Sequence, residues 1–130
     1  MAVSVAPARY THECIEFCKE FVINYPGEEI AKEAWICSTQ SGRKKDKLAN
    51  LQIPVVVSKK VKPPTIESST VAFECQLVGK APTGDHTLFI GNVVAITGNK
   101  KAMKHIYCVN YGKLVSCDCE GNANFKLEYI

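Results

Sequence analysis

The sequence lacks the features of exported and membrane proteins. Its first residues, MAVSVAPARY, contain neither a basic segment nor the apolar run of a secretory signal. No apolar run is long enough to span a bilayer, and we find no internal repeat or low-complexity segment. We therefore expect a cytoplasmic protein with no membrane partner and a single domain over residues 1–130.

The seven cysteines lack a regular spacing. An odd number without an export signal predicts reduced thiols rather than a disulfide framework. Cys14 and Cys18 fall one helical turn apart, and Cys117 and Cys119 form a C-x-C pair, so four thiolates would suit zinc if the tail met the first helix. Because neither pair has C-x-x-C spacing, we expect no structural metal and interpret Cys14 and Cys18 as packing residues.

The charge balance is modest, with 16 basic and 13 acidic residues and a net charge of +3. A hydrophobic fraction of 46% and a charged fraction of 22% are typical of a globular domain rather than a disordered chain. This excess does not by itself imply a nucleic-acid partner, but it would not repel an anionic cofactor.

Hydrophobic periodicity predicts a mainly β (α+β) domain, barrel-like and antiparallel, with two or three short helices packed outside. We expect strands at 2–7, 20–27, 70–80 and 86–97, helices at 11–20 and 28–39, a short helix within 44–51, an extended edge segment at 55–67 and short strands after 103. The short segment APTGD predicts a hairpin between the two long strands. In the second of these, Leu88, Ile90, Val94 and Ile96 are expected to form one apolar face.

The start of the first helix is a candidate anion site. Thr11 is expected to cap this helix, and Arg9 stands beside it. Free N–H groups at a helix start and a guanidinium group both favour a phosphate. The alternative is that Thr11 is only a cap and Arg9 a solvated charge.

A second candidate is the glycine-containing loop SGRKKDK, which carries Arg43, Lys44, Lys45 and Lys47. Such a loop could clamp an anionic ligand or contact nucleic acid, and three further lysines at 59, 60 and 62 add to the positive charge. The aromatic residues expected of a single-strand binder are missing around it, which argues against a nucleic-acid partner. A solvated face is the other interpretation.

His86 is a lone histidine at the entrance to an apolar strand. No Ser-His-Asp arrangement and no second histidine at a metal-ligand offset accompany it. From the residues alone it is a turn residue, and the chain is a basic β domain that could bind a phosphate.

Three segments together resemble the flavin reductase-like family of FMN-binding split barrels, which includes flavoredoxin. VSVAPARYTHECIEFCKEFVINYP is similar to the family's strand, Arg-x-Thr-His turn, helix and following strand. ICSTQSGRKKDKL resembles its Cys-Gly-x-x-Ser-Gly-Arg-x-x-Asp-Lys-Phe loop, and GDHTLFIGNVVAI resembles its Gly-Asp-His-Thr-Leu-Phe-Ile-Gly-Glu-Val strand. The segments occur in the family's order and spacing.

The resemblance implies a homodimer of split β-barrels that holds FMN near the dimer interface. Members of the family take hydride from NAD(P)H onto flavin or pass electrons to a partner protein. By position, Arg9 and Thr11 would belong to the phosphate side of the FMN site, with Arg43 and Lys47 as further anionic contacts. His86 would lie near the flavin ring or the nicotinamide. Gly91 would give the strand room to bend or to approach the ligand.

The sequence also departs from the family pattern. Relatives have strands before the one that begins this chain, and those strands help to bind the flavin phosphate, so the domain is expected to be short at its N-terminus. This leaves a different class open, a non-catalytic split-barrel binding or assembly protein that has lost flavin turnover. A small nucleic-acid-binding barrel using the cations of residues 43–47 is the less favoured third interpretation.

Overall fold

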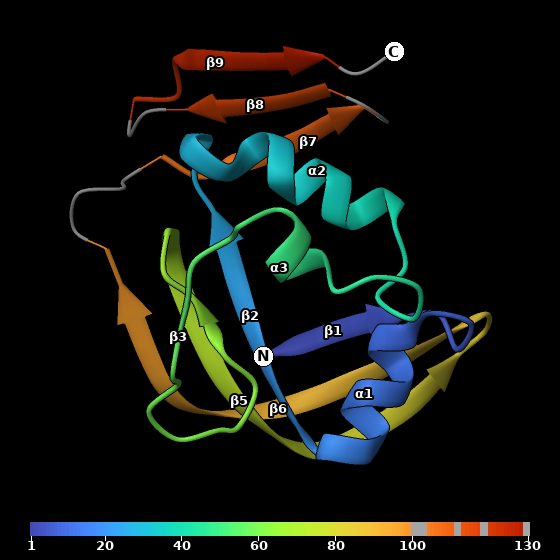
Figure 1. Ribbon diagram of the computed structural model, residues 1–130. Helices are drawn as coiled ribbons and strands as arrows, with labels where there is room; N and C mark the ends of the chain where they lie inside the picture. The colour runs from blue at the N-terminus through green and yellow to red at the C-terminus, as the bar shows by residue number, and fades with distance from the viewer. Residues whose placement is uncertain (100–103, 111–112, 118–119, 129–130) are drawn as a thin grey trace.

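The computed structural model describes residues 1–99, 104–110, 113–117 and 120–128 (Figure 1). The helices are α1 (Tyr10–Cys18), the 3-10 turn η1 (Glu28–Ile30), α2 (Ala31–Thr39) and α3 (Lys47–Asn50). The strands are β1 (Ala2–Val5), β2 (Glu20–Pro26), β3 (Val55–Val56), β4 (Thr65–Ile66), β5 (Ser69–Thr83), β6 (His86–Gly98), β7 (Ile106–Asn110), β8 (Lys113–Cys117) and β9 (Ala123–Glu128). In the described part of the chain, no helix has the length and apolar composition needed to cross a membrane.

The main sheet is antiparallel and has the strand order β1-β6-β5-β2. Its two long strands, β5 and β6, curl together into a half-barrel, with α1 beside the end of β1 (Figure 1). Thr83 pairs with His86 across a two-residue turn in which Gly84 has a φ of 76°. The predicted mainly β class, the antiparallel split-barrel architecture and the hairpin are confirmed.

Two smaller sheets complete the fold. Strands β7, β8 and β9 form an antiparallel sheet, and α2 lies between it and the half-barrel (Figure 1). The segment predicted to be a single extended edge instead folds back on itself, because β3 pairs with β4. The predicted short strands of the tail are present, although the turn expected at 110–112 falls partly on residues 111 and 112, outside the described residues.

The core of the half-barrel is a cluster of four buried residues, Ile15, Phe21, Cys75 and Phe89. Phe89 has no exposed surface, whereas Ile90 is 42% and Ile96 58% exposed. The apolar face predicted for β6 is therefore exposed at both isoleucines. The strand is apolar on both faces, so alternation alone does not choose between them.

Gly91 supports this core. A Cβ atom placed there would lie 2.6 Å from Cζ of Phe21 and 2.8 Å from Cβ of Cys75. No real Cβ atom tolerates such distances without displacing its neighbours. The expectation that Gly91 makes room for a ligand is thus replaced by a requirement of core packing, because the Phe21 ring occupies the space.

The first helix differs from its prediction at both ends. Arg9, not Thr11, is the N-cap residue, and no side chain caps this end. The helix ends at Cys18 because Lys19 adopts the left-handed conformation, with a φ of 58°. Cys14 is half-buried, but Cys18 is exposed, so the packing role expected of Cys18 is wrong.

Candidate functional site

The loop of residues 40–46 lies against the start of α1. Nη2 of Arg43 is 2.5 Å from Oε2 of Glu13, and its Nη1 donates to the carbonyl of Ala8 at 3.4 Å. The same guanidinium lies over the Tyr10 ring, 5.5 Å from its centroid. Two of the predicted site segments, far apart in sequence, are therefore in contact.

Gly42 allows this close approach. A Cβ atom at Gly42 would stand 3.2 Å from Cδ1 of Tyr10. Tyr10 in turn lies beside Cys14, and the electrostatic interaction and hydrogen bond with Cys14 raise the pKa of the Tyr10 hydroxyl. The glycine of the predicted cationic loop thus lets its backbone lie close to an aromatic ring.

Arg9, at the N-cap of α1, is a cation that forms no ion pair with a described residue. Its backbone N–H donates to Ala6 O at 2.9 Å, and its carbonyl accepts from the His12 N–H at 3.0 Å. These bonds fix the backbone at the helix start, while the exposed guanidinium forms no ion pair within the described ranges. A cation beside the first turn of a helix is suited to hold an anion.

Lys47 contacts the end of a helix rather than the start of α1. Its Nζ donates to the carbonyls of Cys37 at 2.8 Å and Gln40 at 3.2 Å, at the C-terminal end of α2. These carbonyls have no partner within their own helix, and an ammonium group also offsets the negative end of the helix dipole. In this arrangement the Lys47 ammonium is turned to the protein rather than to a ligand.

His86 begins β6 at the hairpin. Its Nδ1 lies 2.7 Å from Oδ1 of Asp85, and its carbonyl accepts from Thr83 Oγ1 at 3.1 Å. The hydrogen bond and charge of His86 lower the pKa of the exposed Asp85 carboxyl. The imidazole is therefore oriented by its neighbour while a large part of it stays open to solvent.

His12 joins the helix start to the hairpin strand, and sequence reasoning did not select it. Its Nε2 shares a hydrogen bond of 3.0 Å with Oγ1 of Thr87, and its ring meets that of Phe89 edge to face at 4.9 Å. Thr87 follows His86 and pairs with Val5 at the end of β1. The only available signal was its place in the Arg-x-Thr-His turn, which shows no contact by itself.

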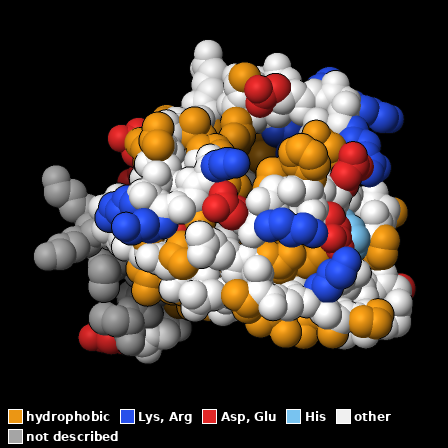
Figure 2. Space-filling model, turned by 90° about the horizontal axis from the view of Figure 1, so that it is seen from below, with side chains coloured by type: hydrophobic (Ala, Val, Ile, Leu, Met, Phe, Trp, Pro, Cys, Tyr) orange, Lys and Arg blue, Asp and Glu red, His pale blue; other side chains and the backbone are white. Residues whose placement is uncertain are grey.

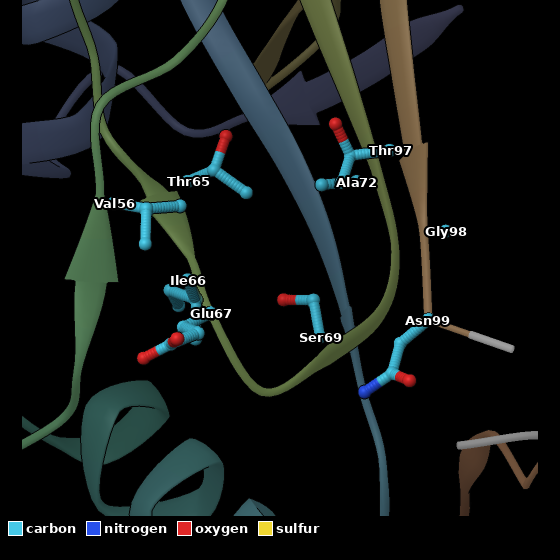
Figure 3. Close-up of a pocket in the computed structure, with 9 residues that line it drawn as sticks. All are labelled: Val56, Thr65, Ile66, Glu67, Ser69, Ala72, Thr97, Gly98 and Asn99. Carbon is cyan, nitrogen blue, oxygen red and sulfur yellow. The ribbon is translucent and has the colours of Figure 1, made fainter. Parts of the chain in front are cut away.

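Together, these contacts place the start of α1, the 40–46 loop and the β5–β6 hairpin on one side of the molecule (Figure 1). A separate hollow of about 280 Å³ lies at the other end of β5 and β6 and contains none of the predicted site residues (Figure 3). It is lined by Val56, Thr65, Ile66, Glu67, Ser69, Ala72, Thr97, Gly98 and Asn99. The predicted site residues thus place the candidate site at the start of α1 and not in this hollow.

The four-thiolate zinc arrangement is not formed by the described residues. Within them, no group of three or more histidine, cysteine, aspartate or glutamate side chains could hold a metal. Helix α1, which carries Cys14 and Cys18, and strand β8, which ends at Cys117, lie at opposite ends of the molecule (Figure 1). Cys119 falls outside the described residues.

A curled antiparallel half-barrel, with helices packed outside and a cationic helix start at one end, defines a split-barrel domain. The model of the flavin reductase like domain matches residues 1–114. The chain belongs to this flavin reductase-like family, as its motifs indicate.

The chain is 41% identical over 97 residues to an uncharacterized protein of Archaeoglobus fulgidus, covering 75% of this chain and 55% of that protein. The chain thus spans little more than half the length of this relative. Among solved structures, it is similar to an FMN-binding protein from Thermus thermophilus with bound p-hydroxybenzaldehyde, with 28% identity, a TM-score of 0.69, and coverage of 76% and 54% of the two chains.

Two more distant structures share the fold. Flavoredoxin of Desulfovibrio vulgaris (Miyazaki F) has 23% identity and a TM-score of 0.73, with 99% of this chain and 70% of that one covered. The NADH:FAD oxidoreductase SgcE6 of Streptomyces globisporus, in complex with NAD and FAD fragments, has 18% identity and a TM-score of 0.68, with 81% and 60% covered.

Proposed function

We propose that this protein binds FMN and works as a flavin reductase or electron carrier that takes hydride from NAD(P)H onto the flavin. The observation that carries the proposal is the Arg9 guanidinium, which stands at the start of α1 without a carboxylate partner among the described residues. A dianionic phosphate would satisfy both the guanidinium and the N–H groups of the first helical turn. The family and the flavin-binding neighbours support the same assignment.

Each predicted residue then has a distinct role. Arg9 and Thr11 hold the phosphate, while Arg43 and Lys47 support the site by fixing the adjacent loop to α1 and α2. Once bound, the flavin supplies the redox chemistry, and the protein supplies its position and electrostatic surroundings. His86, held by Asp85, orients the ring or the incoming nicotinamide.

We extend the proposal to a homodimer located in the cytoplasm. Val78, Ile90 and Ile96 are exposed on β5 and β6. Exposed apolar side chains on neighbouring strands favour association of two copies. A second copy also fits the resemblance, which places FMN near a dimer interface.

Replacing Arg9 tests the phosphate site. Arg9→Ala should weaken FMN binding by about tenfold or more, because a charge-assisted contact to the phosphate is lost. FMN titration followed by flavin fluorescence gives the affinity. Lys32→Ala, which removes an exposed cation from α2, is the matched control and should bind FMN as the unaltered chain does. Equal affinity in all three proteins would refute the role of Arg9.

Replacing His86 separates orientation from binding. His86→Ala should slow reduction of bound FMN by NADH or NADPH by about tenfold, with a much smaller change in FMN affinity. Anaerobic stopped-flow absorbance measures the first quantity and titration the second. Unchanged values of both would make His86 a turn residue. If the unaltered chain holds no FMN at all, the non-catalytic binding or assembly protein becomes the better interpretation.

A further inference from the structure

Two thiols of α1 share one hollow, which adjoins the proposed phosphate site at Thr11. Cys14 and Cys18 lie four residues apart on α1 and both line a cavity of about 360 Å³ between α1, the start of β2 and residues 62–63. Its other lining residues are Thr11, Ile15, Glu20, Phe21, Val22, Lys62 and Pro63. The underside of the molecule, seen in Figure 2, is hollowed and has hydrophobic side chains close to charged ones.

The spacing of the two thiols decides what chemistry they can share. Cβ atoms four residues apart on a helix are separated by about 5–6 Å. A disulfide needs about 3.8 Å, so this pair cannot form one while α1 stays intact. Two metal–sulfur bonds of about 2.3 Å each span the gap between the sulfur atoms readily. An intact helix therefore favours a bridging ion over a disulfide.

The surroundings select the kind of ion. Zinc would need two more ligands, and no third histidine, cysteine or carboxylate joins this pair to form a metal-binding group in the described part of the chain. Thiolates select soft ions such as Cu(I), which accepts two sulfur ligands. Ile15, Phe21 and Pro63 make the hollow largely apolar, which disfavours ions that retain water.

The charges around the hollow are mixed. Two thiolates and one Cu(I) carry a net charge of −1, and both Lys62 and Glu20 are among the lining residues. The backbone N–H of Lys62 donates to Oε2 of Glu20 at 2.9 Å, which fixes this segment at the start of β2. The charge of the exposed Lys62 side chain therefore offsets one of the two negative charges that the complex and Glu20 carry.

We propose that Cys14 and Cys18 form a two-coordinate site for Cu(I). On binding, two S–H bonds are broken, two protons pass to solvent and two Cu–S bonds form. The copper stays Cu(I), so no oxidant or reductant is consumed. Thr11 lies at both this hollow and the proposed phosphate site, but Cu(I) binding by the two thiols does not require the proposed flavin function, and its test needs no flavin.

The experiment measures Cu(I) competition under anaerobic conditions. The tail cysteines could bind Cu(I) themselves, so Cys108, Cys117 and Cys119 are first replaced by serine, and circular dichroism verifies the fold. This background variant should remove one Cu(I) per chain from a chromophoric Cu(I) chelator, and X-ray absorption should show two sulfur ligands. Adding Cys14→Ser or Cys18→Ser should weaken binding by more than ~100-fold, since loss of even an outer partner of a metal ligand costs ~10–100-fold.

Cys37→Ser in the same background is the matched control, because Cys37 is a half-buried helical thiol outside the hollow, and it should leave Cu(I) affinity unchanged. Loss of binding with Cys37→Ser, or full binding without Cys14 and Cys18, would overturn the proposal. If the background variant does not fold, Cys14→Ser/Cys18→Ser is made in the unaltered chain. That pair must then remove one equivalent of bound Cu(I); no loss would again contradict the site.

Discussion

Two lysine-rich loops of this chain have similar composition but are attached to the rest of the protein in different ways, one through side chains and the other through its backbone. In the segment of residues 40–47, the loop before α3 and the first residue of that helix, side-chain cations make the attachments, since Arg43 pairs with Glu13 and Lys47 donates to a carbonyl of α2. In the loop of residues 58–63, backbone N–H groups make the attachments instead. The N–H groups of Lys59 and Lys60 donate to the Glu74 carboxylate at 2.9 and 2.7 Å.

The two loops differ in how many of their positive charges are paired within the protein. In the first loop, two of the positive charges are already used by the fold. In the second, Lys59, Lys60 and Lys62 are exposed, and none forms an ion pair within the described ranges. A charge run in a sequence therefore does not tell how much of its charge remains available to a partner.

The largest effect is expected when the backbone attachments are broken at Glu74, which is only 1% exposed. Glu74→Ala leaves two N–H groups of the loop without their acceptor and should lower the free energy of unfolding by about 3 kcal/mol. Urea denaturation measures this. Glu67→Ala, which removes an exposed carboxylate from the neighbouring turn, should change stability by less than about 0.5 kcal/mol. Equal effects of the two substitutions would show that the Glu74 carboxylate does not hold the loop.

A smaller effect is expected in the other loop at Lys47. Lys47→Met keeps the apolar stem but removes the ammonium that caps α2, and should cost about 1–2 kcal/mol. Lys45→Met is the control, because Lys45 is exposed two residues away and makes no ion pair with a described residue. If Lys45→Met destabilised as strongly in urea, overall charge rather than capping would be responsible.

The smallest effect on stability is expected for an ion pair on the surface, in which Glu16 contacts Lys19 and Lys80. It serves as a reference for the attachments of the two loops. Hydrogen bonds from Lys80 and Lys19 lower the pKa of the Glu16 carboxyl. A carboxyl with a depressed pKa in the folded state stabilises the protein above its unfolded-state pKa. This contribution is lost as the pH falls through the folded-state value. The small stability difference between the unaltered chain and Glu16→Gln should therefore shrink as the pH falls below about 5 and on through the lowered folded-state pKa of Glu16. A difference independent of pH would exclude the ion pair as its source.

The sequence predicts the elements of this fold better than the use of its side chains. The long strands, their hairpin and the first helix follow from periodicity and turn residues, which are local signals. The buried face of β6 does not follow from such local signals. Phe89 and Ile90 are equally apolar, and only the pairing of β6 with β1 and β5 distinguishes them. Glu74 and Cys75 are both buried although neighbouring residues of a strand point to opposite faces, because residues 59 and 60 cover the Glu74 carboxylate and the core encloses Cys75, and alternation does not anticipate this covering loop.

In the candidate site, too, the sequence predicts the segments better than the contacts of their side chains. Its motifs identify the segments that meet at the start of α1, because the resemblance carries their order and spacing. They do not indicate that Lys47 faces α2 or that His12 reaches Thr87, since both contacts join residues through the tertiary fold.

The way residues 58–63 are held has a consequence for the isoelectric point of the protein. Because carboxylates of β5 and β2 hold this loop by its backbone, the fold imposes little on the side chains of Lys59, Lys60 and Lys62. Without these three, the chain would have 16 − 3 = 13 basic residues against 13 acidic ones, and no net charge. The whole positive excess of the molecule thus equals the charge of one replaceable surface loop. Solubility and long-range attraction could be changed there, by selection or by design, while the barrel stays the same.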